Sequence, residues 1–263
     1  MTYFFKKIFN KFQVYFVYYL NKNTRDFFFI LIKRKFLRLL DINKNDKIKN
    51  KYINSWCESK KISEENFYRK IGIKNHKNFF HEKKAFYNSA INKQKKIGFK
   101  MGGMAHLNLI YNLTIHLKPK NILETGVAFG WSTLVFVLSK RNFSKLTSLD
   151  LDYPSMSSHK FVGRALPSNL RTKFKLLKGV DYKFLKNFSE EKKYFDFIHY
   201  DSDKSYDGRK KNYNLIWKIL KKKGCFISDD ISDNSAFYEF VNSNKAKYYI
   251  IKLEKKFIGI LFK

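Results

Sequence analysis

The chain has 263 residues, of which 44% are hydrophobic and 18% aromatic, so it can bury the core of one large domain or of one domain with an extension. Its two cysteines, Cys57 and Cys225, show no CxxC or paired spacing; this argues against a disulfide framework or a zinc site and favours a reducing, cytoplasmic compartment. The formal net charge of +32 would attract nucleic acid or anionic lipid, but the basic residues form no single block, so nucleic-acid binding is not favoured.

The first 50 residues are predicted to form a basic, aromatic helical extension followed by a linker. Aromatic and aliphatic residues from Phe4 to Leu20 recur on one helical face, and Thr24 can cap a second helix. The apolar runs are much shorter than the ~20 residues of a membrane-spanning helix. We expect residues 1–40 to pack on the main domain or on a partner subunit of a homo-oligomer. A peripheral contact with an anionic membrane is the alternative. The polar segment 41–51 has the composition of a linker.

Residues 51–118 are predicted to form a helical cap that contributes to the substrate site. The first glycine of the whole chain is Gly72, and such a sequence favours a run of helices over tight β-turns. Helical spacing predicts the following buried positions: Trp56, Phe67, Ile71, Phe79, Phe80, Phe86 and Ile91.

From residue 119 to residue 263 the pattern changes to short β-rich runs that alternate with helical segments. This alternation predicts an α/β domain with a parallel sheet flanked by helices. The last two runs, KYYIIKLE and KFIGILFK, are almost contiguous and predict a hairpin. The expected sheet is therefore mixed, with an antiparallel C-terminal end.

The stretch ETGVAFGW, residues 124–131, joins the first of these strands to a helix. Its glycines, Gly126 and Gly130, would let a ligand approach the backbone closely at the carboxyl end of the strand. They lie four apart, so the dinucleotide pattern GxGxxG is absent. Glu124 directly before the turn suits a ligand with a cationic amine better than a pyrophosphate, because a carboxylate repels phosphate.

Three acids end the following predicted strands. Asp150 lies where an acid can hold a ribose hydroxyl pair, Asp181 where it can meet an adenine amino group, and Asp201 ends the fourth strand. Any one of them could instead cap the next helix. Their occurrence at successive strand ends favours a ligand site.

With these motifs, residues 100–263 resemble a class I S-adenosylmethionine-dependent methyltransferase of the small-molecule or sugar O-methyltransferase type. The resembling stretches include MGGMAHLNLIYNL, ILETGVAFGWST, LTSLDLD, GVDYKFL and DSDKSYDGRKKNYNL. The resemblance implies a Rossmann-like sheet of seven strands whose last strand is antiparallel. It implies that Glu124, Gly126 and Gly130 hold the methionine part of the cofactor, with Asp150 at the ribose and Asp181 at the adenine. Gly102 would border the methionine end.

A divalent-metal site is a further expectation. Asp201, Asp229 and Asp230 end neighbouring predicted strands, and carboxylates suit Mg²⁺ or another divalent cation. In catechol-type relatives, acids at matching places hold Mg²⁺, and a lysine three residues after the first acid is the base. Here that residue is Lys204, whereas sugar-type relatives usually carry histidine. Lys204 could act as a base only if burial or a metal lowered its pKa.

Two histidines lie close to the predicted site. His106 could line the substrate pocket or be a buried structural residue, and His199 is expected to pack inside the fourth strand.

The lead prediction is O-methylation of a small molecule or saccharide. The alternatives are a nucleic-acid methyltransferase, which the missing (N/D)PPY motif disfavours, a hydroxylase-like relative, and a non-catalytic cofactor-binding module.

Overall fold

The computed structural model describes residues 47–98, 101–104, 106–141, 144–151, 160–254 and 256–263, together with the helical residues Phe29 and Ile32. The predicted extension of residues 1–40 and its membrane contact otherwise lie outside these residues. Within the described part of the chain, no helix is long and apolar enough to cross a membrane.

A run of helices precedes the main sheet, as the sequence predicts. These are α4 (Lys47–Lys60), α5 (Glu64–Ile71), α6 (Phe79–Glu82), α7 (Lys84–Ile97) and α8 (Leu107–Leu117). Helix α4 begins inside the predicted linker, where no glycine or proline opposes a helix. Helices α5 and α7 end at Gly72 and Gly98 in the left-handed conformation that glycine adopts at little cost. Of the predicted core positions here, Phe67 and Phe79 are fully buried and the others partly buried.

Eight strands form one sheet in the order β1-β7-β8-β6-β5-β2-β3-β4. Their bounds are β1 (Lys61–Ile62), β2 (Asn121–Thr125), β3 (Lys145–Asp150), β4 (Lys175–Lys178), β5 (Phe195–Tyr200), β6 (Leu220–Ser228), β7 (Lys247–Leu253) and β8 (Lys256–Phe262). Only β8 runs against its neighbours, β6 and β7. The mixed sheet and the C-terminal hairpin are therefore confirmed.

The sheet has one strand more than the seven expected, because β1 adds to the edge beside β7. Lys61 and Ile62 pair in parallel with Ile250 and Ile251. A strand of two residues has no alternating pattern that a sequence could reveal. It forms because the outer edge of β7 leaves backbone groups that a neighbouring segment can pair with.

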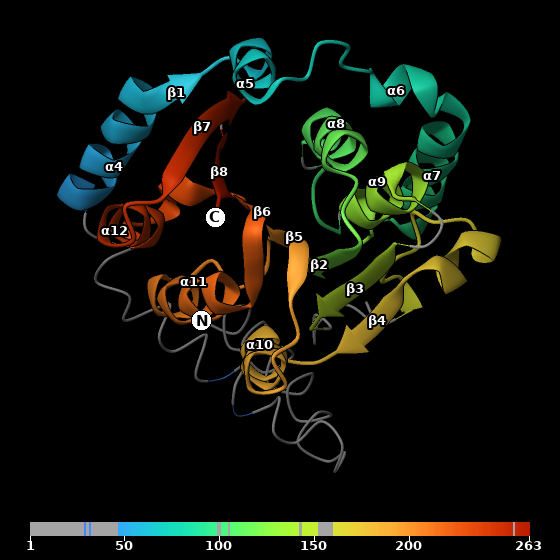
Figure 1. The fold of residues 1–263 in the computed structure, drawn as a ribbon. Coiled ribbons are helices and arrows are strands. Elements are labelled where there is room, and N and C mark those ends of the chain that lie inside the picture. Colours follow the sequence, from blue (N-terminus) through green and yellow to red (C-terminus); the bar gives the residue numbers. More distant parts are fainter. Residues whose placement is uncertain are drawn as a thin grey trace, which may run out of the picture.

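Helices cover both faces of the sheet (Figure 1), each over its own apolar core. Helix α9 (Trp131–Ser139) packs with α8 on one face, while α10 (Asp181–Glu190), α11 (Tyr206–Ile219) and α12 (Ala236–Ser243) cover the other. Side chains alternate between the two cores: Phe197 of β5 faces the first and Ile198 the second. Two 3₁₀ turns, Ser168–Lys173 and Ile231–Asp233, complete the described elements.

The strand order reverses between β2 and β5. From β2 the chain proceeds outward through β3 to β4, and then returns to the other side of β2 with β5 and β6. In open α/β sheets, ligands bind outside the carboxyl ends of the strands at such a switch point. The residues that follow Thr125 and Tyr200 therefore lie where this fold places a ligand site.

Candidate functional site

The carboxyl ends of four strands are joined by backbone hydrogen bonds at the switch point. The N–H of Gly126 donates to the carbonyl of Leu149, at 2.8 Å, and the N–H of Asp201 to that of Thr125, at 2.9 Å. The N–H of Asp229 donates to the carbonyl of Tyr200, at 3.1 Å. The structure thus brings the ends of β2, β3, β5 and β6 together at one edge, as their sequence positions predict.

The turn after β2 depends on its two glycines. Gly126 and Gly130 have φ values of +85° and +97°, a backbone region that other residues rarely adopt. A Cβ atom on Gly126 would lie 2.1 Å from the carbonyl oxygen of Asp201. A Cβ atom on Gly130 would lie 2.8 Å from the Cα of Gly163. Both glycines are therefore required by the packing of neighbouring backbone, whatever ligand the turn holds.

We expect Gly126→Ala to destabilise the protein by about 2–5 kcal/mol. This is the cost of holding alanine in the left-handed conformation added to the cost of its clash with the backbone of Asp201. Gly103→Ala is the matched control, because a Cβ there meets nothing within 4 Å and its φ is not positive. Urea unfolding of both variants measures the difference. Equal midpoints for the two variants would show that the turn is not constrained as described.

Asp150, at the end of β3, holds the glycine turn. Its Oδ2 accepts hydrogen bonds from the backbone N–H groups of Val127 and Ala128, both at 2.7 Å. The side chain is 5% exposed. Asp150 therefore orients the turn directly, and the ribose contact implied by the resemblance stays a prediction.

Glu124 lies beneath the turn and not at its surface. It is 0% exposed, and its carboxylate accepts hydrogen bonds from the hydroxyls of Ser132, Thr133 and Ser148, at 2.5, 2.7 and 2.7 Å. These hydroxyls come from α9 and β3, so Glu124 ties the strand to its neighbours. The carboxylate of Glu124 exposes no surface to which the methionine amine could bind directly. The role of Glu124 at the cofactor stays a prediction.

Asp181 also faces protein groups. Its Oδ2 accepts from Ser202 Oγ, at 2.6 Å, and from Asn212 Nδ2, at 3.0 Å. Asn212 in turn donates to the hydroxyl of Tyr200. Asp181 thus connects the start of α10 to the end of β5, and its predicted contact with adenine is not tested. Gly102, at φ +72°, lies against the turn: a Cβ there would be 3.1 Å from that of Ala128.

Two lysines form ion pairs with Asp201, at the end of β5, and with Asp230, after β6. Lys204 Nζ lies 2.9 Å from Asp201 Oδ1 and also forms an ion pair with Asp230. Lys256, at the start of β8, lies 2.9 Å from Asp230 Oδ1. Burial alone would lower the pKa of Lys204, but the charges of Asp201 and Asp230 outweigh it and raise that pKa above its ordinary value. Lys204 therefore stays protonated, and the lowered pKa that a base at this position requires is not found.

The environment of Asp201 favours its neutral form, whereas that of Lys204 favours the charged form. Burial, followed by the nearby charge of Asp229, raises the pKa of Asp201 to about 6 despite the ion pair with Lys204. Its side chain is 27% exposed, whereas that of Asp230 is 8% exposed. Asp201 is thus the more accessible of these two carboxylates.

Asp229 lies between two histidines. Its Oδ1 is 3.6 Å from His199 Nε2 and 3.7 Å from His106 Nε2, and all three groups are buried. Burial lowers the pKa of His106. For His199, the nearby carboxylate of Asp229 outweighs burial and raises the pKa. The packing expected for His199 is observed, and His106, at the start of α8, reaches the same carboxylate.

These residues do not fit a divalent cation as they are arranged. Two of the three predicted ligands, Asp201 and Asp230, are already paired with lysine ammonium groups. Across the described ranges, no group of three or more His, Cys, Asp or Glu side chains is placed to hold a metal ion. Lys204 supplies positive charge at the place where the sequence predicts the metal.

Lys256 is the contact that sequence reasoning missed. It lies 26 residues from Asp230 along the chain and reaches it only because β8 returns beside β6. Nothing in the local sequence distinguishes Lys256 from the many other lysines. The contact of His199 with Asp229 had only a weak signal, because His199 was predicted inside the fourth strand and Asp229 at the end of the neighbouring strand.

Comparison with known proteins adds a family match over the central part of the chain. A family model described as "Methyltransferase domain" matches residues 123–231, which run from β2 past the end of β6. No curated protein matches the sequence significantly.

Solved structures match about two thirds of the chain or more. An O-methyltransferase from Bacillus cereus, in complex with S-adenosylhomocysteine, has a TM-score of 0.56 and 17% identity, covering 68% of this chain and 91% of that one. The O-methyltransferase TomG from Streptomyces achromogenes, in complex with S-adenosylmethionine, has a TM-score of 0.53 and 12% identity, and the match covers 68% of this chain and 89% of that one. A methyltransferase from Geobacter sulfurreducens has a TM-score of 0.51 and 13% identity, and the match covers 77% of this chain and 98% of that one. At these identities the likeness establishes the fold.

Proposed function

We propose that this chain, which has the fold of the class I S-adenosylmethionine-dependent methyltransferases, is an O-methyltransferase that acts on a hydroxyl group of a small molecule or saccharide. The observation that carries the proposal is the left-handed glycine turn, held by Asp150 at the switch point of the sheet. The O-methyltransferases among the structural neighbours support the reaction class. The acceptor, the cytoplasmic location, the oligomeric state and the membrane contact of residues 1–40 stay predictions.

The turn and the strand ends around it would hold the cofactor. S-adenosylmethionine, when bound, supplies a methyl group on a sulfonium sulfur. The bare backbone at Gly126 and Gly130 would admit its methionine part, and Gly102 would close that end of the site. Asp150 keeps the turn in place for this contact through the N–H groups of Val127 and Ala128.

The acid cluster would hold the acceptor and take its proton. The acceptor hydroxyl would face Asp201, the more exposed carboxylate, which would receive the proton as the new oxygen–carbon bond forms and the carbon–sulfur bond breaks. Lys204 would keep Asp201 oriented and ionised through its 2.9 Å ion pair. His106 and Asp229 would form the buried wall behind this cluster.

Assistance by a divalent metal stays a hypothesis, and replacing Lys204 tests it. In the native protein we expect weak Mg²⁺ binding, because Lys204 compensates both Asp201 and Asp230. Lys204→Ala removes the ion pair of Asp201 and leaves Asp230 paired with Lys256 alone. It should strengthen Mg²⁺ binding by about tenfold or more, since carboxylates close together favour a divalent cation. Calorimetric titration with Mg²⁺ measures this.

Lys210→Ala is the control for this titration, because Lys210 is exposed on α11 and contacts Tyr206 and no carboxylate directly. Tight Mg²⁺ binding by the native protein, lost in Asp229→Ala, would instead support the metal site predicted from the sequence.

The experiment that tests the function combines two measurements on the full chain. Calorimetry with S-adenosylhomocysteine tests the cofactor site, and methyl transfer from radiolabelled S-adenosylmethionine to a panel of sugars and catechols tests the reaction. Binding that is weakened in Asp150→Ala, together with transfer to a hydroxyl, supports the proposal. The absence of binding in a folded protein would overturn it.

A further inference from the structure

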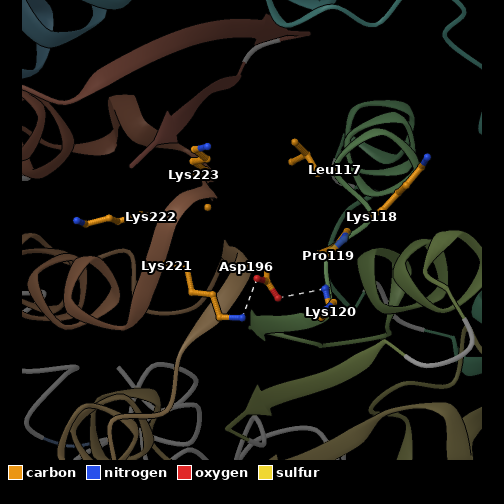
Figure 2. A pocket seen from close by; sticks show the side chains of 9 residues that line it. Leu117, Lys118, Pro119, Lys120, Asp196, Lys221, Lys222 and Lys223 are labelled. Carbon is orange, nitrogen blue, oxygen red and sulfur yellow. Dashed lines mark hydrogen bonds and ion pairs between the residues drawn. The ribbon is translucent and has the colours of Figure 1, made fainter.

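A cavity lies at the amino-terminal edge of the parallel strands, at the opposite end of the sheet from Gly126. It is a cleft of about 360 Å³, within the roughly 300–1,000 Å³ range of small-ligand sites. Figure 2 shows its two walls, Leu117–Lys120 from the connection between α8 and β2 and Lys221–Gly224 from β6, with Asp196 of β5 between them. We call this feature the lysine cleft.

The single acid of the lysine cleft is fully engaged. Asp196 Oδ1 lies 2.9 Å from Lys221 Nζ, and its Oδ2 accepts from the backbone N–H groups of Lys120 and Asn121, at 3.1 and 2.7 Å. Five lysines against one aspartate leave a net charge of +4. The remaining four ammonium groups pair with no carboxylate of the described residues: Lys118, Lys120, Lys222 and Lys223.

Two of these lysines occupy strained backbone positions. Lys118, at the end of α8, has a φ of +50°, and Lys223, in β6, has a φ of +63°. Glycine or asparagine adopts this left-handed region with less strain than lysine. The rest of the fold holds the conformation, since the N–H of Lys223 donates to the carbonyl of Lys263 at 2.5 Å.

The surrounding edge adds to the positive field. Lys145, Lys175 and Lys247 start β3, β4 and β7 at the same edge of the sheet, and all are exposed. Burial, with the charge of Lys222, lowers the pKa of Lys263 next to the cleft. Lysines therefore begin several strands along this edge of the sheet.

We propose that the lysine cleft binds a small ligand that carries several phosphate groups. Ammonium groups bind phosphate as point charges, and a net charge of +4 calls for a ligand with several negative charges. Figure 2 shows Lys118 and Lys222 extending away from each other on opposite sides of the cleft. A ligand with several phosphate groups therefore suits these two lysines better than a single phosphate ion. Such phosphates belong either to a free ligand or to a lipid headgroup. The site is separate from methyl transfer and does not depend on that function.

Calorimetric titration of the full chain with sodium tripolyphosphate tests the free ligand. We expect saturable binding that weakens between about 0.1 M and about 1 M salt, because the Debye length falls from roughly 10 Å to 3 Å. The double variant Lys222→Gln/Lys223→Gln should raise the Kd by about tenfold. Saturating S-adenosylhomocysteine should leave the tripolyphosphate affinity unchanged, because the two sites lie at opposite edges.

The control variant is Lys70→Gln/Lys96→Gln, which removes the same charge from exposed positions on α5 and α7. Sedimentation with vesicles of phosphatidylcholine and a phosphatidylinositol bisphosphate, whose headgroup carries several phosphate groups, forms the second arm. Vesicle binding that the cleft variant alone loses, without tripolyphosphate binding, identifies a lipid headgroup as the source and supports the site. Equal losses in both variants, or no binding to either probe, would overturn the proposal. Circular dichroism verifies that each variant is folded.

Discussion

Replacing Asp201 with asparagine should lower kcat for methyl transfer by about 10²–10⁴-fold, the usual contribution of a positioned base. Asparagine keeps the shape of the side chain but cannot accept the proton from the acceptor hydroxyl. The backbone of residue 201 supports the glycine turn through the hydrogen bond to Thr125 and the contact with Gly126, and the substitution changes neither. The affinity for S-adenosylhomocysteine should therefore stay within about twofold of the native value.

The matched control for this prediction is Asp207→Asn, the same change at an exposed residue in the first turn of α11. It should leave kcat and cofactor affinity close to the native values. If Asp201→Asn retained native kcat, Asp201 would not be the base. An equal loss of kcat and of cofactor affinity would indicate that it supports the structure of the site.

Glu124→Ala should lower the free energy of unfolding by about 3–5 kcal/mol, because it leaves the buried hydroxyls of Ser132, Thr133 and Ser148 without their shared acceptor. Glu124→Gln keeps an acceptor of the same shape, and we expect it to recover most of this loss. Urea unfolding measures both variants. The exposed Glu65, on α5, offers a control substitution to alanine that should cost no more than about 1 kcal/mol.

The same pair of variants tests the contact with the methionine amine that the resemblance implies. If Glu124 acts only through the turn, Glu124→Gln should bind S-adenosylhomocysteine nearly as well as the native protein. A loss of about tenfold or more in affinity without a loss of stability would show that the charge of Glu124 reaches the cofactor. That result would contradict the buried position found here.

Local patterns carried most of the fold prediction. Strands such as β2 and β5 are short apolar runs bounded by polar turns, and the helix between β2 and β3 follows a glycine turn, so periodicity and glycine positions are sufficient to locate them. The hairpin of β7 and β8 was predictable because its strands are almost contiguous. Strand β1 was not, since two residues carry no period and its pairing with Ile250 joins distant segments.

The candidate site was predictable in its location but not in its contacts. Strand ends meet at one edge in any parallel sheet, so the sequence alone indicated that Asp150, Asp201 and Asp229 lie near the glycine turn. Which groups these carboxylates pair with depends on side chains that the tertiary fold brings from other elements. Lys204 pairs with both Asp201 and Asp230, and Lys256 from β8 pairs with Asp230. The roles of these residues as base and as metal ligands stay predictions.

From its own residues, then, the chain specifies a mixed α/β sheet with a ligand-binding edge, because hydrophobic period and glycine conformation are local properties. Only the tertiary structure decides that Glu124 is buried among hydroxyls, that Lys204 stays protonated, and that the lysines of the lysine cleft stand around one engaged aspartate. Burial and charge compensation depend on neighbours that are distant in sequence, and these two quantities set the pKa values of Asp201 and Lys204 and the accessibility of Glu124.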